Sequence, residues 1–306
     1  MNRWQTVKPE QKYTVTMFDR EFPSEDACLE YVKEQRFPGG VALCVNCKVE
    51  RKHYRVSART SYACHACGNH IYPLAGTIFH KSTTSLRTWF LVIRLMASTR
   101  VGISAKHIQR ETGVTYKTAW RMMKQVRKLM EDRITLSGPV EIDEAEFGGA
   151  DSNKPKHLRG KAKMTALGIV ERGGRVVAQI VPNITALTLC SSIAETVEPD
   201  SPVFTDLMHS YNPLGVQFEH QTVNHSVTYV DGPAHTNTID GFWSLVKRGI
   251  TGVYYQVGAE YLQSYLNEYA FRYNRRKVMR PMFSLLAERT VTQVCPSARE
   301  QKLLGS

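Results

Sequence analysis

The sequence has no long apolar run, no internal repeat and no low-complexity tract. A membrane-spanning helix needs about 18 or more consecutive apolar residues, so we expect no membrane span. Residues 1–19 are polar and mixed in charge and lack the apolar centre of a secretion signal. Acidic residues are also few, with 28 Asp and Glu against 40 Lys and Arg, which gives a net charge of +12. These features predict a cytoplasmic protein whose positive field favours polyanions, nucleic acid first.

Four of the seven cysteines form two close pairs, Cys44-Val-Asn-Cys47 and Cys64-His-Ala-Cys67, with 16 residues between the pairs. This spacing is typical of a structural zinc site, in which each pair lies on a tight turn and four thiolates surround one ion. Two disulfides, or four unrelated thiols, are the alternatives, and the missing export signal favours metal. Zinc would supply the folding energy of a segment too small and polar to bury a core. The neighbouring histidines are interpreted as bystanders: His53, His65 and His70.

A zinc ribbon alone does not identify a partner, because some ribbons bind DNA and others bind protein. The composition of this one favours DNA, since basic residues run through it with aromatic residues between them. They are Lys48, Arg51, Lys52, Arg55 and Arg59, with Tyr54 and Tyr62.

The stretch from Leu86 to Met130 has a helical pattern with two interruptions, at residues 100–103 and 112–114. The second interruption contains Gly113, and Thr115 can cap the helix that follows. This order predicts a helix-turn-helix, with an ordinary helical hairpin as the alternative. In a helix-turn-helix, side chains near the start of the second helix reach base edges or phosphates. Here these are Thr115, Tyr116, Lys117 and Arg121.

A break at Ser137-Gly138-Pro139 separates the helical region from a region rich in strands. The pattern predicts a strand, a hairpin, a helix, a strand, a small helix and strand, and two further helices. In order they cover residues 140–147, 165–171 with 175–181, 187–197, 202–205, 208–223, 237–248 and 260–274. This α/β order is that of the ribonuclease-H-like fold.

Three acids occupy positions that this fold would bring together. Asp143 lies in the middle of a strand, Asp206 follows a strand end, and Asp240 lies on a helix. Strand alternation places Glu141 on the same face as Asp143, and Lys247 follows Asp240 by about two helical turns. Carboxylates favour Mg²⁺ or Mn²⁺, and two such ions would support phosphoryl transfer on DNA. Taken singly, each acid is more simply a solvated surface charge.

A cluster of basic residues follows the strand that carries Asp143. We expect it to contact DNA phosphates, with a solvated loop as the alternative. Its members are Lys154, Lys156, Arg159, Lys161 and Lys163.

Together these motifs resemble bacterial insertion-sequence transposases of the DDE type, in the branch with an N-terminal zinc ribbon. The resemblance covers roughly residues 30–290, and its most specific block is His235-Thr-Asn-Thr-Ile-Asp-Gly-Phe-Trp-Ser-Leu-Val-Lys-Arg-Gly249. The other matching stretches are Cys44 to Cys67, Gly76-Thr-Ile-Phe79, Gly113-Val-Thr-Tyr-Lys-Thr-Ala-Trp120, Glu141-Ile-Asp-Glu144 with Gly148-Gly149, His225-Ser226 and Phe271-Arg-Tyr-Asn-Arg-Arg276.

The resemblance implies a ribonuclease-H-like core that cleaves and transfers DNA strands at terminal inverted repeats, acting as a homo-oligomer on the repeats and on target DNA. It also implies Asp143 and Asp206 as the first two metal ligands. For the third ligand, the branch uses Asn or an acid at the positions of Asn237 and Asp240, with a basic residue at that of Lys247. Position 240 is more often Glu in this branch. The alternatives are a non-catalytic DNA-binding protein derived from such an enzyme and a metal-dependent nuclease without strand transfer.

The predicted domain organisation follows from these motifs. It comprises a helical lead-in (1–40), a zinc ribbon (41–80), a helix-turn-helix region (84–136), a ribonuclease-H-like catalytic domain (139–290) and a tail (291–306).

Overall fold

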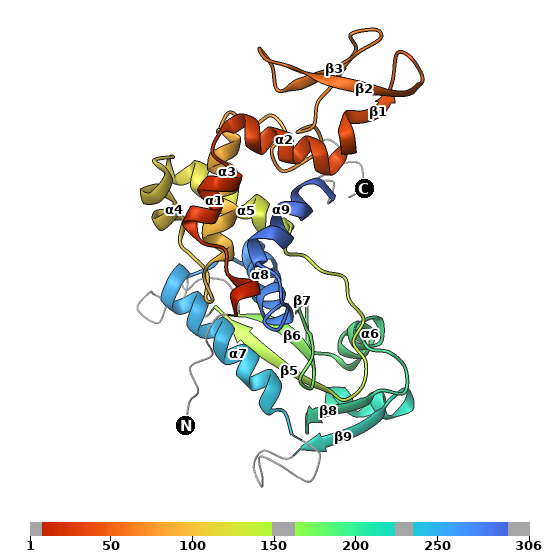
Figure 1. Cartoon of the computed structure of the whole chain (residues 1–306). Helices are drawn as coiled ribbons and strands as arrows, with labels where there is room; N and C mark the ends of the chain where they lie inside the picture. The colour runs from red at the N-terminus through yellow and green to blue at the C-terminus, as the bar shows by residue number, and fades with distance from the viewer. Residues whose placement is uncertain (1–7, 149–162, 224–234, 293–306) are drawn as a thin grey trace. The chain divides into compact units, whose positions relative to one another are not determined.

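A computed structural model of the chain describes residues 8–148, 163–223 and 235–292 (Figure 1). The chain divides into two compact units. The first comprises residues 1–99, 105–129 and 278–306, and the second comprises residues 100–104 and 130–277. Among the described residues, no helix combines the length and the apolar character needed to cross a membrane.

The first unit is mainly helical. Its helices are α1 (Val15–Glu21), α2 (Glu25–Arg36), α3 (Leu86–Ala97), α4 (Ala105–Thr112), α5 (Tyr116–Lys128) and α9 (Met282–Thr292), with short 3-10 turns η1 (Pro9–Gln11) and η2 (Pro38–Gly40). Aromatic rings join these helices, and the ring of Phe22 lies 4.6 Å from that of Phe90 and 5.7 Å from that of Phe283. Trp89 is fully buried beside them. The core of this unit therefore joins residues from both ends of the chain.

A small antiparallel sheet completes the first unit. Its strands are β1 (Val41–Cys44), β2 (Val49–Val56), β3 (Ser61–Cys64) and β4 (His70–Ile71), in the order β1-β2-β3-β4. The pairing of Cys44 with Val49 and of His53 with Cys64 brings two turns to one end of the sheet.

The second unit is built on a five-stranded mixed sheet. Its strands are β5 (Val140–Phe147), β6 (Met164–Glu171), β7 (Val176–Val181), β8 (Pro202–Asp206) and β9 (Glu219–Val223), in the order β7-β6-β5-β8-β9. The first three strands pair antiparallel, whereas β5–β8 and β8–β9 pair parallel. The predicted hairpin is confirmed, and Gly173 in its turn has a φ of +72°, which glycine adopts without steric cost.

Helices cover both faces of this sheet (Figure 1). Helix α6 (Ala186–Thr196) and the 3-10 segment η4 (His209–Val216) pack on one face, against Ile142 and Ile169 among others. Helices α7 (Asn237–Gly249) and α8 (Leu262–Asn274) pack on the other face, against Ala145 and Val170. The predicted alternation along β5 is thereby confirmed. A π-helical turn, η5 (Ile250–Tyr254), and a 3-10 turn, η6 (Ala259–Tyr261), connect α7 to α8.

Helix α9 begins inside the limits 139–290 predicted for the catalytic domain, but it packs against α2 and α3 in the first unit. The compact second unit ends at Lys277. The remaining predicted domain limits stay predictions.

Candidate functional site

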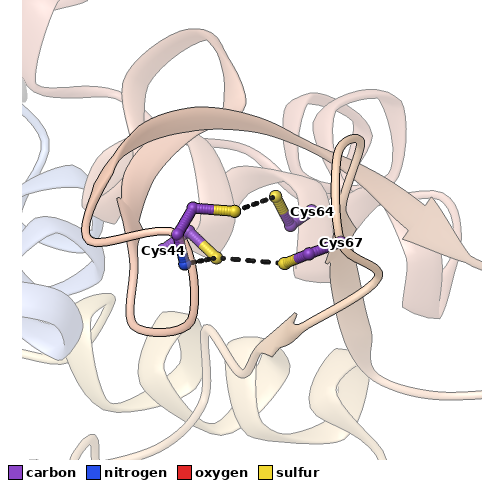
Figure 2. Close-up of side chains that lie close together, drawn as sticks. Cys44, Cys64 and Cys67 are labelled. Carbon is purple, nitrogen blue, oxygen red and sulfur yellow. Dashed lines mark hydrogen bonds between the residues drawn. The ribbon is translucent and has the colours of Figure 1, made fainter.

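The four paired cysteines form one cluster in the small sheet. Their sulfur atoms all lie within 4.8 Å of one another, with 3.5 Å between those of Cys44 and Cys67 and 4.0 Å between those of Cys47 and Cys64 (Figure 2). A tetrahedral zinc ion with Zn–S bonds of about 2.3 Å separates its sulfurs by roughly 3.8 Å. The donor set and its spacing therefore fit zinc. Within the described residues, no histidine belongs to this cluster.

Each cysteine pair lies on the same kind of turn. After the first pair, the amide of Lys48 donates to the carbonyl of Cys44 (2.7 Å), and after the second the amide of Gly68 donates to the carbonyl of Cys64 (2.9 Å). Both closing residues have positive φ, +57° for Lys48 and +72° for Gly68. Two equivalent turns thus face each other across the cluster and orient the thiolates toward one centre.

The second candidate site forms where β5 and β8 run parallel. The register pairs Val140 with Val203 and Glu141 with Phe204, so continuing it by two residues aligns Asp143 with Asp206. Both side chains are half-buried. Adjacent strands lie about 4.8 Å apart, which places the two carboxylates on neighbouring positions.

The electrostatics of Asp143 report which charged groups surround it. Burial, together with the nearby carboxylates of Asp240 and Asp206, raises the pKa of Asp143 to about 6, although Lys247 acts to lower it. Three of the other residues predicted from sequence, Asp206, Asp240 and Lys247, are therefore close enough to Asp143 to influence its pKa. The oxygens of the three aspartates do not all approach within the 4.8 Å found for the cysteines, in the part of the chain that is described. Asn237 is exposed at the first residue of α7, one turn before Asp240.

Glu141 connects β5 to α7. The sequence predicted only that it lies on the same face of the strand as Asp143. Its side chain is fully buried and accepts hydrogen bonds from the backbone amides of Thr238 (2.7 Å) and Ile239 (3.1 Å). It also accepts from the hydroxyl of Thr238 and from Arg172 (both 2.9 Å). Because Thr236 at the helix start provides no side-chain cap, Glu141 supplies the negative charge that a helix N-terminus favours.

Glu144 is a second residue that sequence reasoning did not single out. Burial, opposed by a hydrogen bond from the hydroxyl of Tyr211 and supported by the charges of Asp206 and Asp143, raises the pKa of Glu144 to about 7. Tyr211 belongs to η4, on the opposite face of the sheet from Asp240. Strand alternation places the side chains of Glu144 and Asp143 on opposite faces of the sheet. The charge of Asp206, at the end of β8, nevertheless raises the pKa of both. The sequence signal was the run of acids from Glu141 to Glu146.

The residues predicted to contact DNA lie in different parts of the chain. Thr115 caps α5 by accepting from the amide of Thr118 (3.2 Å), and α4 and α5 flank a turn at Gly113, where φ is +72°. All four predicted recognition residues of this helix start are exposed: Thr115, Tyr116, Lys117 and Arg121. In the basic cluster, Lys163 is exposed and lies 2.5 Å from Glu146. The other predicted residues, Lys154, Lys156, Arg159 and Lys161, lie outside the described residues, as do His225 and Ser226.

Comparison with known proteins finds two family matches. Residues 135–274 match the ISXO2-like transposase domain, and residues 23–70 match the transposase zinc-ribbon domain. The second match contains the cysteine cluster, so the two findings together support a structural zinc ion. The first match spans β5 to α8 and includes all three aspartates.

Two curated proteins are similar to this chain. An uncharacterized protein in transposable element ISH50 of Halobacterium salinarum is 28% identical over 275 residues, covering 82% of this chain and 91% of that protein. An uncharacterized transposase-like protein of Haemophilus influenzae is 34% identical over 105 residues, covering 34% of this chain and 85% of that protein. Among solved structures, a chain of the simian T-cell lymphotropic virus intasome in complex with a PP2A regulatory subunit matches with 14% identity and a TM-score of 0.27. It covers 58% of this chain and 65% of that chain, and a score this low supports no conclusion.

Proposed function

This chain belongs to the family of insertion-sequence transposases with an N-terminal zinc ribbon, and from that premise we propose that it cleaves and transfers DNA strands at the terminal inverted repeats of an insertion sequence. One observation carries the proposal: Asp143, Asp206 and Asp240, from a strand, a strand end and a helix, meet closely enough to alter the pKa of Asp143. Carboxylates held close together repel one another, and a bound cation would offset this repulsion.

The sheet topology supports a ribonuclease-H-like core. Three antiparallel strands are followed, across a helix, by two strands parallel to the first, and the first strand is central. Asp143 lies on this central strand and Asp206 ends its parallel neighbour. With helices on both faces of the sheet, the acids would gather where the end of β8 lies beside the middle of β5.

The chemistry of the donor set fits divalent cations with oxygen ligands. Asp143, Asp206 and Asp240 would hold Mg²⁺ or Mn²⁺, because hard cations prefer carboxylates. When bound, two such ions supply activation of a water or a DNA 3′-hydroxyl and stabilisation of the leaving oxygen. The raised pKa of Asp143 is that of the metal-free protein.

The chain's own residues would orient the reaction. Glu141 holds the start of α7 against β5, which fixes Asp240 relative to Asp143. Lys247, whose charge is felt at Asp143, would position a DNA phosphate as a point charge. The reaction needs no covalent link between protein and DNA.

Recognition of DNA is assigned to the first unit and to the basic cluster. The arrangement of α4, the turn at Gly113 and the capped α5 supports a helix-turn-helix whose exposed residues read the terminal repeat. The ribbon would add contacts to phosphates, as would the cluster from Lys154 to Lys163. We expect a homo-oligomer on DNA, because two element ends must be handled together.

Cleavage of a duplex copied from the DNA that flanks the coding sequence tests the proposal. Wild-type protein with Mn²⁺ should nick this duplex and join the cut end to a target strand, and Asp143→Asn should bind it without cutting. Cutting without joining would make the protein a nuclease, and binding without cutting would make it a non-catalytic DNA-binding protein. Normal cleavage by Asp143→Asn would refute the carboxylate mechanism.

A further inference from the structure

An exposed tyrosine in an unusual backbone conformation ends the helical segment that carries Asp240. Helix α7 continues into the π-helical turn η5, and Tyr255 follows with φ +63° and ψ −53°. The amide of Gln256 donates to the carbonyl of Tyr254 (2.7 Å), which closes a γ-turn around Tyr255. A γ-turn with positive central φ is rare and strained, and π-helical turns occur frequently at functional sites.

The residue before it is firmly anchored. The hydroxyl of Tyr254 donates to the carboxylate of Glu268 (3.3 Å), and its ring packs edge-on against Tyr265 at 4.6 Å. Arg272 in turn donates to Glu268 (2.6 Å). A β-carbon on Gly102 would lie 2.2 Å from the Tyr254 hydroxyl, so the backbone at Gly102 packs directly against the side chain of Tyr254. These contacts fix the position from which Tyr255 projects.

Folding alone does not account for Tyr255. Its side chain is 88% exposed, so it gains almost nothing from burial. Glycine would adopt the same turn without strain, whereas a bulky aromatic residue adopts it at a cost. A costly conformation that displays a large ring to solvent indicates a use outside the folded chain.

The surroundings of Tyr255 indicate what the ring contacts. Lys247 and Arg248 are exposed at the end of α7, and Thr251 and Gln256 are exposed on either side of the turn. Residues 247–256 include these two basic residues and no acid, and the next acid along the chain is Glu260, so this stretch carries a positive charge that suits a nucleic-acid backbone. An aromatic ring on a positive surface is the arrangement that stacks bases, because every base offers a flat face.

We propose that Tyr255 stacks on a base that is unpaired or turned out of the duplex in the bound end DNA. The proposal rests on the function proposed above and adds a base contact to it. Tyr255 follows Asp240 by fifteen positions, which corresponds to about 20 Å along the helix axis. At about 3.4 Å per nucleotide, the stacked base lies roughly six nucleotides from the nucleotide held at Asp240, where the DNA follows α7.

Binding affinity and fluorescence test the stacking together. The probe is the duplex copied from the flanking DNA, with 2-aminopurine placed in turn at each of the terminal positions. Wild-type protein should change the fluorescence strongly at one or two positions. Tyr255→Ala should lose that change and bind about 5- to 150-fold more weakly, while Tyr255→Phe should keep both. Because stacking releases no counterions, Tyr255→Ala should leave the salt dependence of binding unchanged, whereas the control Arg248→Ala should reduce its slope by about 0.9.

Tyr255→Gly separates a loss of stacking from a loss of folding. This variant relieves the backbone strain, so its melting temperature should equal or exceed that of the wild type while its DNA affinity falls as in Tyr255→Ala. A Tyr255→Gly protein that melts at a lower temperature would show that the ring stabilises the fold, and would overturn the inference.

The remaining outcomes distinguish this inference from the proposed function. If wild type binds end DNA and Tyr255→Ala shows the same affinity and fluorescence, stacking is refuted and the proposed function stands. If Tyr255→Ala changes only the oligomeric state measured without DNA, the ring contacts protein and stacking is again refuted. If wild type binds neither end DNA nor an unrelated duplex, both proposals fail.

Discussion

The buried carboxylate of Glu141 accepts a hydrogen bond of 2.7 Å from the backbone amide of Thr238, so the strand that carries Asp143 is fastened to the helix that carries Asp240. The contact joins residues 97 positions apart in the sequence. It satisfies amides at the start of α7 that would otherwise lack partners, and it places a negative charge at the helix end that favours one. The relative position of two candidate metal ligands therefore depends on a residue that need not touch metal or DNA.

Glu141→Ala should lower the free energy of unfolding of the second unit by about 3–5 kcal/mol, because it leaves Arg172 and the start of α7 without their buried partner. Urea denaturation of the full chain measures the loss. Glu146→Ala is the matched control: its exposed pair with Lys163 should be worth less than about 1 kcal/mol. Equal stability of the two variants would contradict the role assigned to Glu141.

Zinc should be present at one ion per chain, held by Cys44, Cys47, Cys64 and Cys67. Cys64→Ser should lose the ion and unfold the small sheet, because metal binding supplies much of its stability. Elemental analysis of protein purified without chelators measures the content. Cys190→Ser changes a half-buried cysteine of the second unit and should keep the zinc. Full zinc content in Cys64→Ser would reject the assignment.

Lys48→Gly should stabilise the zinc-binding sheet. Lys48 has a φ of +57° in the turn where the equivalent residue of the other turn is Gly68. A side chain at such a φ costs roughly 1 kcal/mol, which glycine does not incur. The variant should therefore require more chelator for zinc removal than the wild type, and the reverse change Gly68→Lys should require less. A lower chelator requirement for Lys48→Gly would contradict the strain argument.

Most of the second unit could be predicted from local sequence patterns. Strand β5 occupies the predicted residues 140–147, because apolar and acidic residues alternate there and a glycine–proline break precedes it. Strand β8 ends at Asp206 as expected, and the α7 pattern places Asp240 and Lys247 on one face. These features depend on neighbours within a few residues, which the sequence displays directly.

The remaining features depend on distant parts of the chain. The role of Glu141 needs Arg172 and Thr238, which lie 31 and 97 residues away. Glu144 has a raised pKa because folding buries it beside Asp206, although alternation points it away from Asp143. Helix α9 packs on helices near the opposite end of the chain, so no local pattern assigned it to the first unit. The roles of the site residues stay predictions until they are tested.

The pKa of Asp143 gives a test of metal binding that does not depend on activity. The folded value of about 6 lies above the unfolded value near 3.9, so the folded state binds more protons and stability falls as pH rises from about 4 to 6. Asp143→Asn removes this cost and should raise the stability of the metal-free protein at pH 7 by on the order of 1–3 kcal/mol. Thermal denaturation in the presence of a chelator measures it.

In the presence of Mn²⁺, the wild type should be more stable than Asp143→Asn, which is the reverse of their order in the metal-free state. Binding to the folded state alone raises the melting temperature of the wild type, whereas Asp143→Asn lacks a ligand and should respond little. Asp200→Asn, which changes an exposed acid on a turn, should behave as the wild type. An equal Mn²⁺ response in wild type and Asp143→Asn would show that the ion binds elsewhere.

The third metal ligand should be Asp240 rather than Asn237. Both residues begin α7 and lie three positions apart, so both can face the acids on β5 and β8. Asp240 contributes more than Asp206 to the raised pKa of Asp143, which places its charge near the site, and a carboxylate binds a hard cation better than a neutral amide. The opposing interpretation makes Asn237 the ligand and Asp240 a charge that the helix N-terminus favours.

In a cleavage assay with Mn²⁺, Asp240→Asn should lose on the order of 100-fold or more in rate, and Asn237→Ala should lose less. Normal cutting by Asp240→Asn together with an inactive Asn237→Ala would reverse the assignment. A faster Asp240→Glu would show that the shorter acid limits reach, which keeps position 240 as the ligand.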